Sequence, residues 1–237
     1  MTNREIQETI KTVLGLKKDM VGIKAWKELP RRIKKYEGKA FPGFCSQIGE
    51  VLKTGETFCT DEENQLCTGG VIATGVTPPV SEEESPRILQ MHIEMMNDYP
   101  DIERAERYRE NMEKLIPAPH EKNAFVQLGL FIDLQEPDLA ILFCSPGSAD
   151  IITRTYAYVM GEPVIGFAGN GGCQFAIQYP YATKKPSFTH SDITWRKFVG
   201  LSDDELTITF PYPCLTRFIE SLPAVAERYR SYGKGME

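Results

Sequence analysis

The chain of 237 residues carries a formal net charge of −6 and has a pI near 5.3, so it lacks a basic footprint for nucleic acid or an anionic membrane surface. Residues 1–5 lack the apolar core of a signal peptide, and no segment approaches the ~20 apolar residues of a membrane span. With an ordinary 41% of hydrophobic residues, the sequence predicts a cytoplasmic globular protein without nucleic-acid or membrane partners.

Helices and one early strand are predicted for the first part of the chain. Thr2 and Glu5 form a capping-box pattern that begins a helix with an apolar face. Residues 20–26 then alternate like a strand, and residues 44–52 have the spacing of a short helix. The following segment, residues 54–75, is rich in Thr, Gly and acids and predicts loop with a short strand.

A second capping box at residues 81–84 begins another predicted helix. Pro100 ends this helix, and Asp101 begins a highly charged helix that runs to about Leu115. One face of the first helix carries a set of apolar side chains and one histidine: Ile88, His92, Met95, Met96 and Tyr99. We expect this face, together with Met91, to fill the core, with an adaptable pocket wall as the alternative.

Strands and helices alternate in the second half. Strands are predicted at residues 125–131, 139–143, 163–167 and 206–210. Ser145 and Pro146 supply the N-cap and first residue of a helix through about Met160, and a last helix begins near Pro213. This order predicts a single mixed domain over residues 1–237, of the α/β or α+β class.

Six cysteines without any C-x-x-C pair are the most informative feature for function: Cys45, Cys59, Cys67, Cys144, Cys173 and Cys214. In a reducing compartment such residues are expected as free thiols, metal ligands or catalytic groups. Cys144, Cys173 and Cys214 each fall where a predicted strand hands over to a helix, where the helix dipole favours thiolate over thiol. The alternative is a small buried apolar group, which we favour for Cys144 and Cys214, whereas Cys173 stays open.

The other three cysteines, Cys45, Cys59 and Cys67, fall within one segment whose spacing matches neither zinc fingers nor common ferredoxins. A metal site would therefore have to gather ligands from distant parts of the chain. Cys67 is followed at positions 69 and 70 by glycines, which would allow a backbone to approach a bulky ligand closely. A tight turn beside a buried thiol is the competing interpretation.

Residues 166–172 form a glycine-rich loop before Cys173, without the spacing of a dinucleotide site or the lysine of a P-loop. Its amides could still bind an anion at the helix start. The candidate ligand-binding residues are Gly69, Gly70, Gly169, Gly171, Gly172 and Arg196. Among the three histidines, we expect His92 in the core and His120 in a loop, and His190 is the best acid–base candidate.

The order and spacing of these segments resemble the bacterial and archaeal family called domain of unknown function 169, over nearly the whole chain. The resemblance rests on residues 14–16, 21–24, 44–45, 67–70, 137–139 and 172–173, on Asp192 and Arg196, and on residues 203–206. It implies that Cys45, Cys67 and Cys173 occupy the family's characteristic cysteine positions, and it supplies no activity.

Three hypotheses follow, and none assigns a catalytic residue. The leading one is a redox or metal-linked protein that holds an iron–sulfur cluster or another thiophilic metal through Cys45, Cys67 and Cys173, with the fourth position left to Cys59, a substrate or water. The second is a metal-free module that binds an anionic small molecule through the glycine loop and Arg196. The third is an interaction protein that uses the helix of residues 81–99. The oligomeric state stays open.

Overall fold

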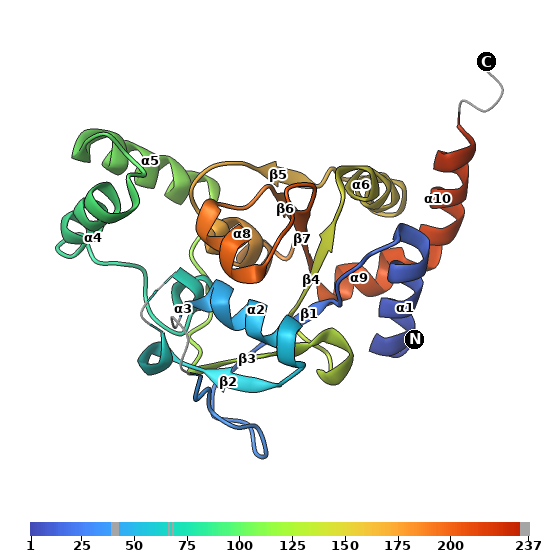
Figure 1. The fold of residues 1–237 in the computed structure, drawn as a ribbon, viewed down its shortest axis with the longest axis horizontal. Helices are drawn as coiled ribbons and strands as arrows, with labels where there is room; N and C mark the ends of the chain where they lie inside the picture. Colours follow the sequence, from blue (N-terminus) through green and yellow to red (C-terminus); the bar gives the residue numbers. More distant parts are fainter. Residues whose placement is uncertain (39–42, 66, 68, 233–237) are drawn as a thin grey trace.

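The computed structural model describes residues 1–38, 43–65, 67 and 69–232, and they build a seven-stranded sheet in the order β2-β3-β1-β4-β7-β6-β5 (Figure 1). Its strands are β1 (Val21–Trp26), β2 (Phe58–Thr60), β3 (Phe125–Leu130), β4 (Leu139–Cys144), β5 (Ile165–Phe167), β6 (Ser187–Thr189) and β7 (Leu206–Pro211). Neighbouring strands are antiparallel except β5 and β6, which run parallel. The mixed sheet and its helices confirm the predicted mixed α/β class.

Ten α-helices are present in the described part of the chain: α1 (Asn3–Leu14), α2 (Phe44–Thr54), α3 (Gly69–Ala73), α4 (Ser85–Met91), α5 (Ile102–Leu115), α6 (Pro146–Met160), α7 (Tyr179–Thr183), α8 (Ile193–Val199), α9 (Tyr212–Phe218) and α10 (Leu222–Ser231). Two π-helical turns, η2 (His92–Met96) and η4 (Gln174–Gln178), and three 3-10 turns, η1 (Glu62–Asn64), η3 (Phe131–Asp133) and η5 (Ile219–Ser221), interrupt or extend them. None of these helices is long and apolar enough to cross a membrane.

Each face of the sheet carries an apolar core, and β4 contributes to both because successive side chains of a strand point to opposite faces. Leu139, Ile141 and Phe143 join the cluster that includes residues of α2 and α8. The intervening residues, ending at Cys144, join a cluster built with α1, α6, α9 and α10. In Figure 1 these two groups of helices lie on opposite sides of the sheet. Burial on both faces explains why β4 reads as a continuous apolar run.

The predictions that rested on helix caps and on strand patterns are confirmed. The Thr2 hydroxyl accepts the Glu5 amide, and the Glu5 carboxylate accepts the Thr2 amide at 2.7 Å, so the capping box at α1 is complete. Ser145 caps α6 as expected, and its hydroxyl accepts the amide of Ser148. The predicted strands correspond to β1, β3, β4, β5 and β7. Helices α3 and α8 and strand β6 lay outside those predictions.

The helix predicted for residues 81–99 differs from the structure in two respects. It begins at Ser85, and at His92 it passes into the π-helical turn η2. Its apolar face is not core: Met91, Met95 and Met96 are all exposed. The prediction that these methionines fill the core is therefore wrong, because spacing along a helix defines a face without showing what covers it.

Helices α4 and α5, with the turn η2 between them, form an arm that we call the α4–α5 arm (residues 81–116). Figure 1 shows it at one side of the molecule, away from the sheet. Its elements bury little: Ser85 and Leu89 in α4, and Ala105 in α5. It joins the body where Met112 packs against a small cluster that contains Phe175. The arm therefore has much less packing than the sheet and its covering helices.

The close approach of α2 to α8 yields a test of the fold. A β-carbon on Gly49 of α2 would lie far inside van der Waals contact with the backbone oxygen of Phe198 in α8. We expect Gly49→Ala to lower the free energy of unfolding by about 2–3 kcal/mol, because rigid backbone must move apart. Urea-induced unfolding followed by circular dichroism would measure the loss.

Gly147→Ala is the matched control, because a β-carbon at this position in α6 would meet nothing closer than 4.0 Å. In a helix this change should leave stability unchanged or raise it by roughly 0.5 kcal/mol. Equal stability of Gly49→Ala and the wild type would contradict the close packing of α2 on α8.

Candidate functional site

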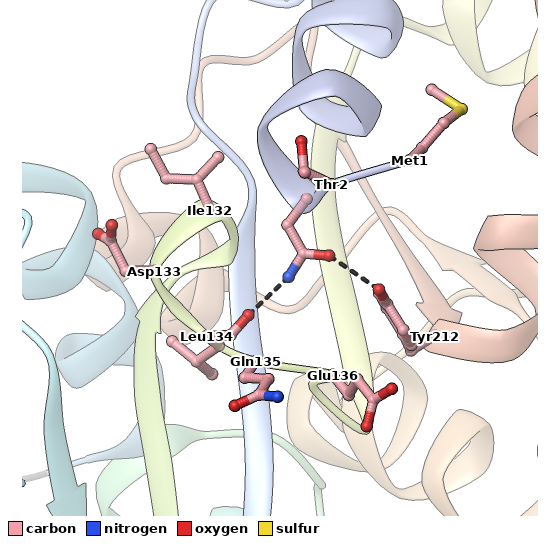
Figure 2. A pocket seen from close by; sticks show the side chains of 9 residues that line it. Met1, Thr2, Ile132, Asp133, Leu134, Gln135, Glu136 and Tyr212 are labelled. Carbon is pink, nitrogen blue, oxygen red and sulfur yellow. Dashed lines mark hydrogen bonds between the residues drawn. The ribbon is translucent and has the colours of Figure 1, made fainter.

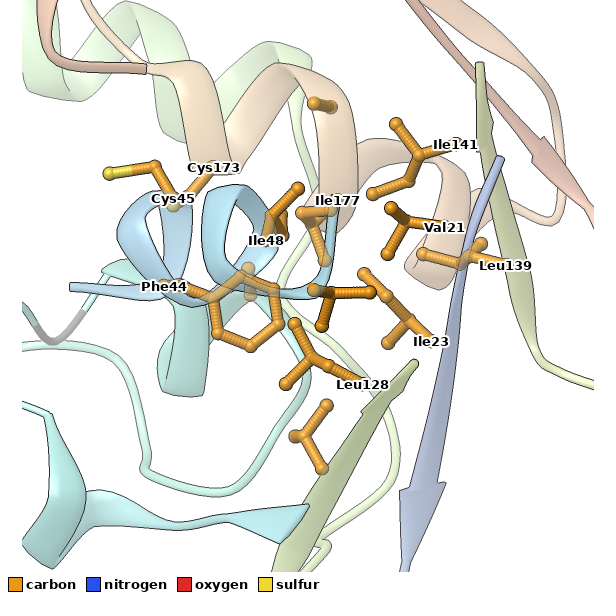
Figure 3. Packing of buried hydrophobic residues seen from close by; sticks show 14 of the residues in the cluster. Val21, Ile23, Phe44, Cys45, Ile48, Leu128, Leu139, Ile141, Cys173 and Ile177 are labelled. Carbon is orange, nitrogen blue, oxygen red and sulfur yellow. The ribbon is translucent and has the colours of Figure 1, made fainter. Parts of the chain in front are cut away.

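Three cysteines from distant parts of the chain lie together at the edge of the apolar cluster beside α2. Cys45 is in the first turn of α2, Cys67 precedes α3, and Cys173 lies directly before η4. A β-carbon on Gly69 would lie 3.7 Å from the sulfur of Cys67 and 3.7 Å from the sulfur of Cys173. These two sulfurs are therefore no more than twice that distance apart. Figure 3 shows Cys45 and Cys173 side by side at one end of the cluster. Both of these thiols interact electrostatically with Cys67.

Glycines allow these segments to approach one another. A β-carbon on Gly70 would collide with the ring of Phe44, so only glycine lets α3 meet the start of α2. Gly172 lies equally close to α8, since a β-carbon there would be 2.9 Å from Asp192 Oδ2 and 3.0 Å from Trp195 Cβ. Real β-carbons hardly ever come so close to other atoms. The glycines that the sequence suggested for ligand approach thus serve the packing of helix on helix.

A carboxylate holds the start of α8 against the segment that carries Cys173. Asp192 is the N-cap of α8, and its Oδ1 accepts the amide of Trp195 at 2.7 Å. Its Oδ2 accepts the amide of Gly172, the residue before Cys173, at 2.6 Å. Both oxygens are therefore engaged by backbone donors. The sequence analysis gave Asp192 no role of its own, although an Asp three residues before Trp195 is a recognisable helix-start signal.

Burial keeps Cys45 and Cys173 protonated. Burial, with smaller effects of Cys67 and Asp192, raises the pKa of Cys45 to about 12. The pKa of Cys173 is also raised well above its usual value, first by burial and then by Cys67, Cys45 and Asp192. The sequence left the character of Cys173 open between thiolate and buried apolar group, and its burial favours the buried, protonated thiol. Neither residue is an activated nucleophile at neutral pH.

The other cysteines do not join this cluster. Cys59 is fully buried in β2 between Phe58 and Thr60, whose side chains face α2, so the alternation of a strand turns Cys59 to the other face. Burial alone raises its pKa to about 12. Cys144 packs in the core with α6, and the sulfur of Cys214 contacts the Lys184 carbonyl oxygen at 3.4 Å.

The thiols of Cys144 and Cys214 are not activated either. Burial raises the pKa of Cys144 to about 12 and also raises the pKa of Cys214. Strands β4 and β7 are antiparallel, so Cys144 at the end of β4 and Cys214 after the end of β7 lie toward opposite ends of these strands. The favoured interpretation of Cys144 as a buried apolar group fits this environment.

No group of three or more His, Cys, Asp or Glu side chains within residues 1–38, 43–65, 67 and 69–232 is arranged to hold a metal ion. Sulfurs around one tetrahedral ion lie within roughly 4 Å of one another. The bound on the Cys67 and Cys173 sulfurs, twice 3.7 Å, also admits the roughly 6–7 Å between cysteine sulfurs around a four-iron cluster. As it stands, the cluster is a set of free thiols.

The groups expected to bind an anion are occupied by the protein itself. Arg196 donates to the carbonyl oxygens of His190 and Glu205, and also to that of Ser202. Its guanidinium thus fastens the loop between α8 and β7. Gly169 and Gly171 are the glycines of the loop with positive φ, at 135° and 156°. They lie under α5, where Tyr108 and Met112 would meet any added β-carbon.

The three histidines lie outside the thiol cluster. His92 Nδ1 is 2.9 Å from Asp98 Oδ2, and its side chain is 40% exposed, so the prediction of a core histidine is wrong. His190 is exposed in the loop before α8, and its carbonyl oxygen, not its ring, contacts Arg196. His120 lies in the loop that follows α5. Among the described residues, none of the three histidines is hydrogen-bonded to a cysteine.

A surface hollow of about 330 Å³, separate from the thiol cluster, lies beside the start of α1 (Figure 2). Asn3 crosses it: its amide donates to the carbonyl oxygen of Leu134 at 2.6 Å, and its Oδ1 accepts the Tyr212 hydroxyl at 2.9 Å. These bonds fasten α1 to the loop after η3 and to α9. The hollow is therefore a structural junction, and no thiol lines it.

The fold and site define a mixed α/β protein with a cluster of three free thiols between helix starts. A family model described as DUF169, Uncharacterised ArCR, matches residues 9–221. The chain therefore belongs to this family of unknown function, and the resemblance predicted from its sequence is confirmed. Neither a curated protein nor a solved structure matches the chain.

Thiol labelling would test the environment of the cluster. In the folded protein we expect iodoacetamide to modify the partly exposed Cys67 and Cys214 and to spare Cys45 and Cys173, because buried thiols with raised pKa values react slowly. Mass spectrometry of peptides gives the rate at each position, and labelling in urea should reach all six cysteines. Fast modification of Cys173 in the folded state would contradict its burial.

Proposed function

We propose that the protein is a metal-binding protein in which Cys45, Cys67 and Cys173 hold an iron–sulfur cluster or another thiophilic metal. The observation that carries the proposal is the meeting of three free thiols from separate segments, with Cys173 more than 100 residues from the other two along the chain. Soft thiolate ligands select zinc, Cu(I) and iron–sulfur clusters over harder cations. The chain can therefore supply three sulfur ligands from three separate helix starts.

The donor set fits a centre with one open position. Three sulfurs leave a fourth ligand of a tetrahedral ion, or the fourth iron of a cluster, without a cysteine. Asp192 is beside the thiols, yet both of its oxygens already accept backbone amides. Cys59 faces away from the cluster. Water or a substrate is therefore the fourth ligand in this proposal, which is the arrangement of reactive rather than purely structural centres.

Electrostatics also supports a cation at this position. Burial is the main cause of the raised pKa values of Cys45 and Cys173, and the charges of Cys67 and Asp192 add to it for both residues. A bound cation reverses this effect, because it stabilises the thiolates and replaces their protons. The metal-free alternative, an anion bound through Arg196, has less support because that guanidinium already donates to three carbonyl groups.

Reconstitution of cysteine variants tests the proposal. We expect the wild-type protein, purified without oxygen and supplied with ferrous iron and sulfide, to bind iron in a fixed ratio and gain visible absorbance. Cys67→Ser should lose both signals, and because Cys67 is partly exposed its unfolding free energy should change by less than about 0.5 kcal/mol.

Cys59→Ser is the matched control, since it changes the same residue type outside the cluster and should bind iron like the wild type even if it is less stable. Zinc and cobalt are tested in parallel, with metal content measured after gel filtration. Wild-type protein that binds none of these metals, or Cys67→Ser protein that binds them normally, would refute the metal centre.

The pH dependence of metal binding gives a second test. The pKa values of Cys45 and Cys173 lie above the usual thiol value, so both are protonated at neutral pH and a metal must displace their protons. Affinity for Co²⁺ should rise with pH between about 6.5 and 8.5, by up to about tenfold per pH unit for each proton released. Competition titrations followed by the thiolate–cobalt charge-transfer band measure this slope. A flat profile would mean that the thiols are not the ligands.

A further inference from the structure

The α4–α5 arm exposes an unusual concentration of large apolar side chains. Five of the eleven such side chains exposed in the described part of the chain belong to it: Met91, Met95, Met96, Ile102 and Leu115. Met95 alone is 76% exposed. Monomeric proteins seldom expose such groups together unless they serve an interaction. The arm is therefore a surface that no other segment of the described residues covers.

The same arm carries most of the net charge of the protein. Residues 81–116 contain ten acidic and five basic side chains, a net charge of −5, against −6 for the whole chain. Three of the five bases, Arg104, Arg107 and Arg109, form ion pairs within α5 and its cap. Glu106 and Glu110 are exposed and have no ion pair among the described residues. The apolar side chains thus lie within a negatively charged rim.

A second surface has the opposite charge. Residues 24–35 comprise the end of β1 and the segment after it. They contain six basic residues and one acidic residue, a net charge of +5. Within the described structure, Arg31, Arg32 and Lys34 have no ion pair, whereas Lys27 and Lys35 are paired elsewhere. Figure 1 shows the segment after β1 as a loop that projects beyond β2. We call residues 27–35 the basic loop, and it exposes one large apolar side chain, Leu29.

We propose that the α4–α5 arm binds the basic loop of a second copy of this chain. The two surfaces are complementary in charge, each exposes apolar groups, and no ion pair of the described residues joins them within one molecule. Since each copy has one arm and one loop, two equal contacts related by a two-fold axis close a dimer. Electrostatic complementarity of this kind steers association and fixes the register of the partners.

The contact would bring the second copy close to the thiol cluster. Tyr108 of the arm donates a hydrogen bond to the carbonyl oxygen of Asn170 at 2.8 Å, three residues before Cys173. The inference does not depend on metal binding, because the arm and the loop lie outside the three cysteines. Failure of one proposal therefore leaves the other standing.

Charge exchange between the two surfaces is the decisive experiment. Light scattering after gel filtration should give the mass of two chains for the wild type at about 50 mM salt and a lower mass at about 500 mM, because salt screens exposed charges. Glu106→Lys with Glu110→Lys, or Arg31→Glu with Arg32→Glu, should each give the mass of one chain. All four changes together restore opposite charges across both contacts and should restore the dimer.

Glu8→Lys with Glu227→Lys is the control, since it makes the same charge change as the first variant on exposed positions of α1 and α10. It should remain dimeric, and circular dichroism verifies that each variant is folded. A wild-type mass of 26.8 kDa at every salt concentration overturns the proposal. A dimer that is unaffected by either charge reversal, or a fourfold variant that stays monomeric, overturns it as well.

Discussion

The carboxylate of Asp192 connects the parts of the molecule on which the candidate site depends. One oxygen fixes the first turn of α8 and the other holds the amide before Cys173, at 2.7 and 2.6 Å. Helix α8 in turn packs on α2 at Gly49, and α2 carries Cys45. A charged acceptor for backbone amides forms a stronger bond than a neutral one. The Asp192 side chain thus joins the start of α8 to the segment before Cys173. Because α8 packs on α2, the positions of Cys173 and Cys45 both depend on this carboxylate.

This arrangement has an electrostatic consequence that a purely structural clamp would not need. Burial opposes the ionisation of Cys45 and Cys173, and the nearby half-buried carboxylate of Asp192 opposes it further, so the pKa values of both thiols are raised. Ordinary thiol chemistry is thereby suppressed at the position where thiols are most concentrated. The same negative surroundings favour a bound cation, because the cation is attracted to each anionic group near it.

Predictions from the sequence were successful where the cause of a structure lies within a few neighbouring residues. The caps at Thr2 and Ser145 depend on local hydrogen bonds, and β4 depends on an apolar run, so each could be recognised in advance. Helix α8 was missed because seven residues carry too little periodicity, although its Asp192 cap was visible. The exposed methionines show what helical periodicity cannot predict: it identifies the apolar face of a helix but not whether another element packs on that face.

The site itself could be predicted only in part. Spacing along the chain cannot show that Cys67 and Cys173 meet, because their approach depends on packing between distant segments, including the contact of Gly70 with Phe44. The exclusion of Cys59 depends on strand parity: once Phe58 and Thr60 face α2, the residue between them must face the other way. The family resemblance selected the same three cysteines without any geometry.

The contrast between the body and the α4–α5 arm links these observations. Near the thiols, Gly70 and Gly172 bring segments so close that a β-carbon would collide, whereas the arm exposes apolar side chains and leaves Glu106 and Glu110 without an ion pair among the described residues. Tyr108 and Met112 connect the two regions at the loop before Cys173. Because packed elements move as units while weakly packed ones open at low cost, the arm is the part of the described structure most able to respond to a partner. Any such response would reach the thiol cluster through the loop of Gly169 to Gly172, which ends at the amide held by Asp192.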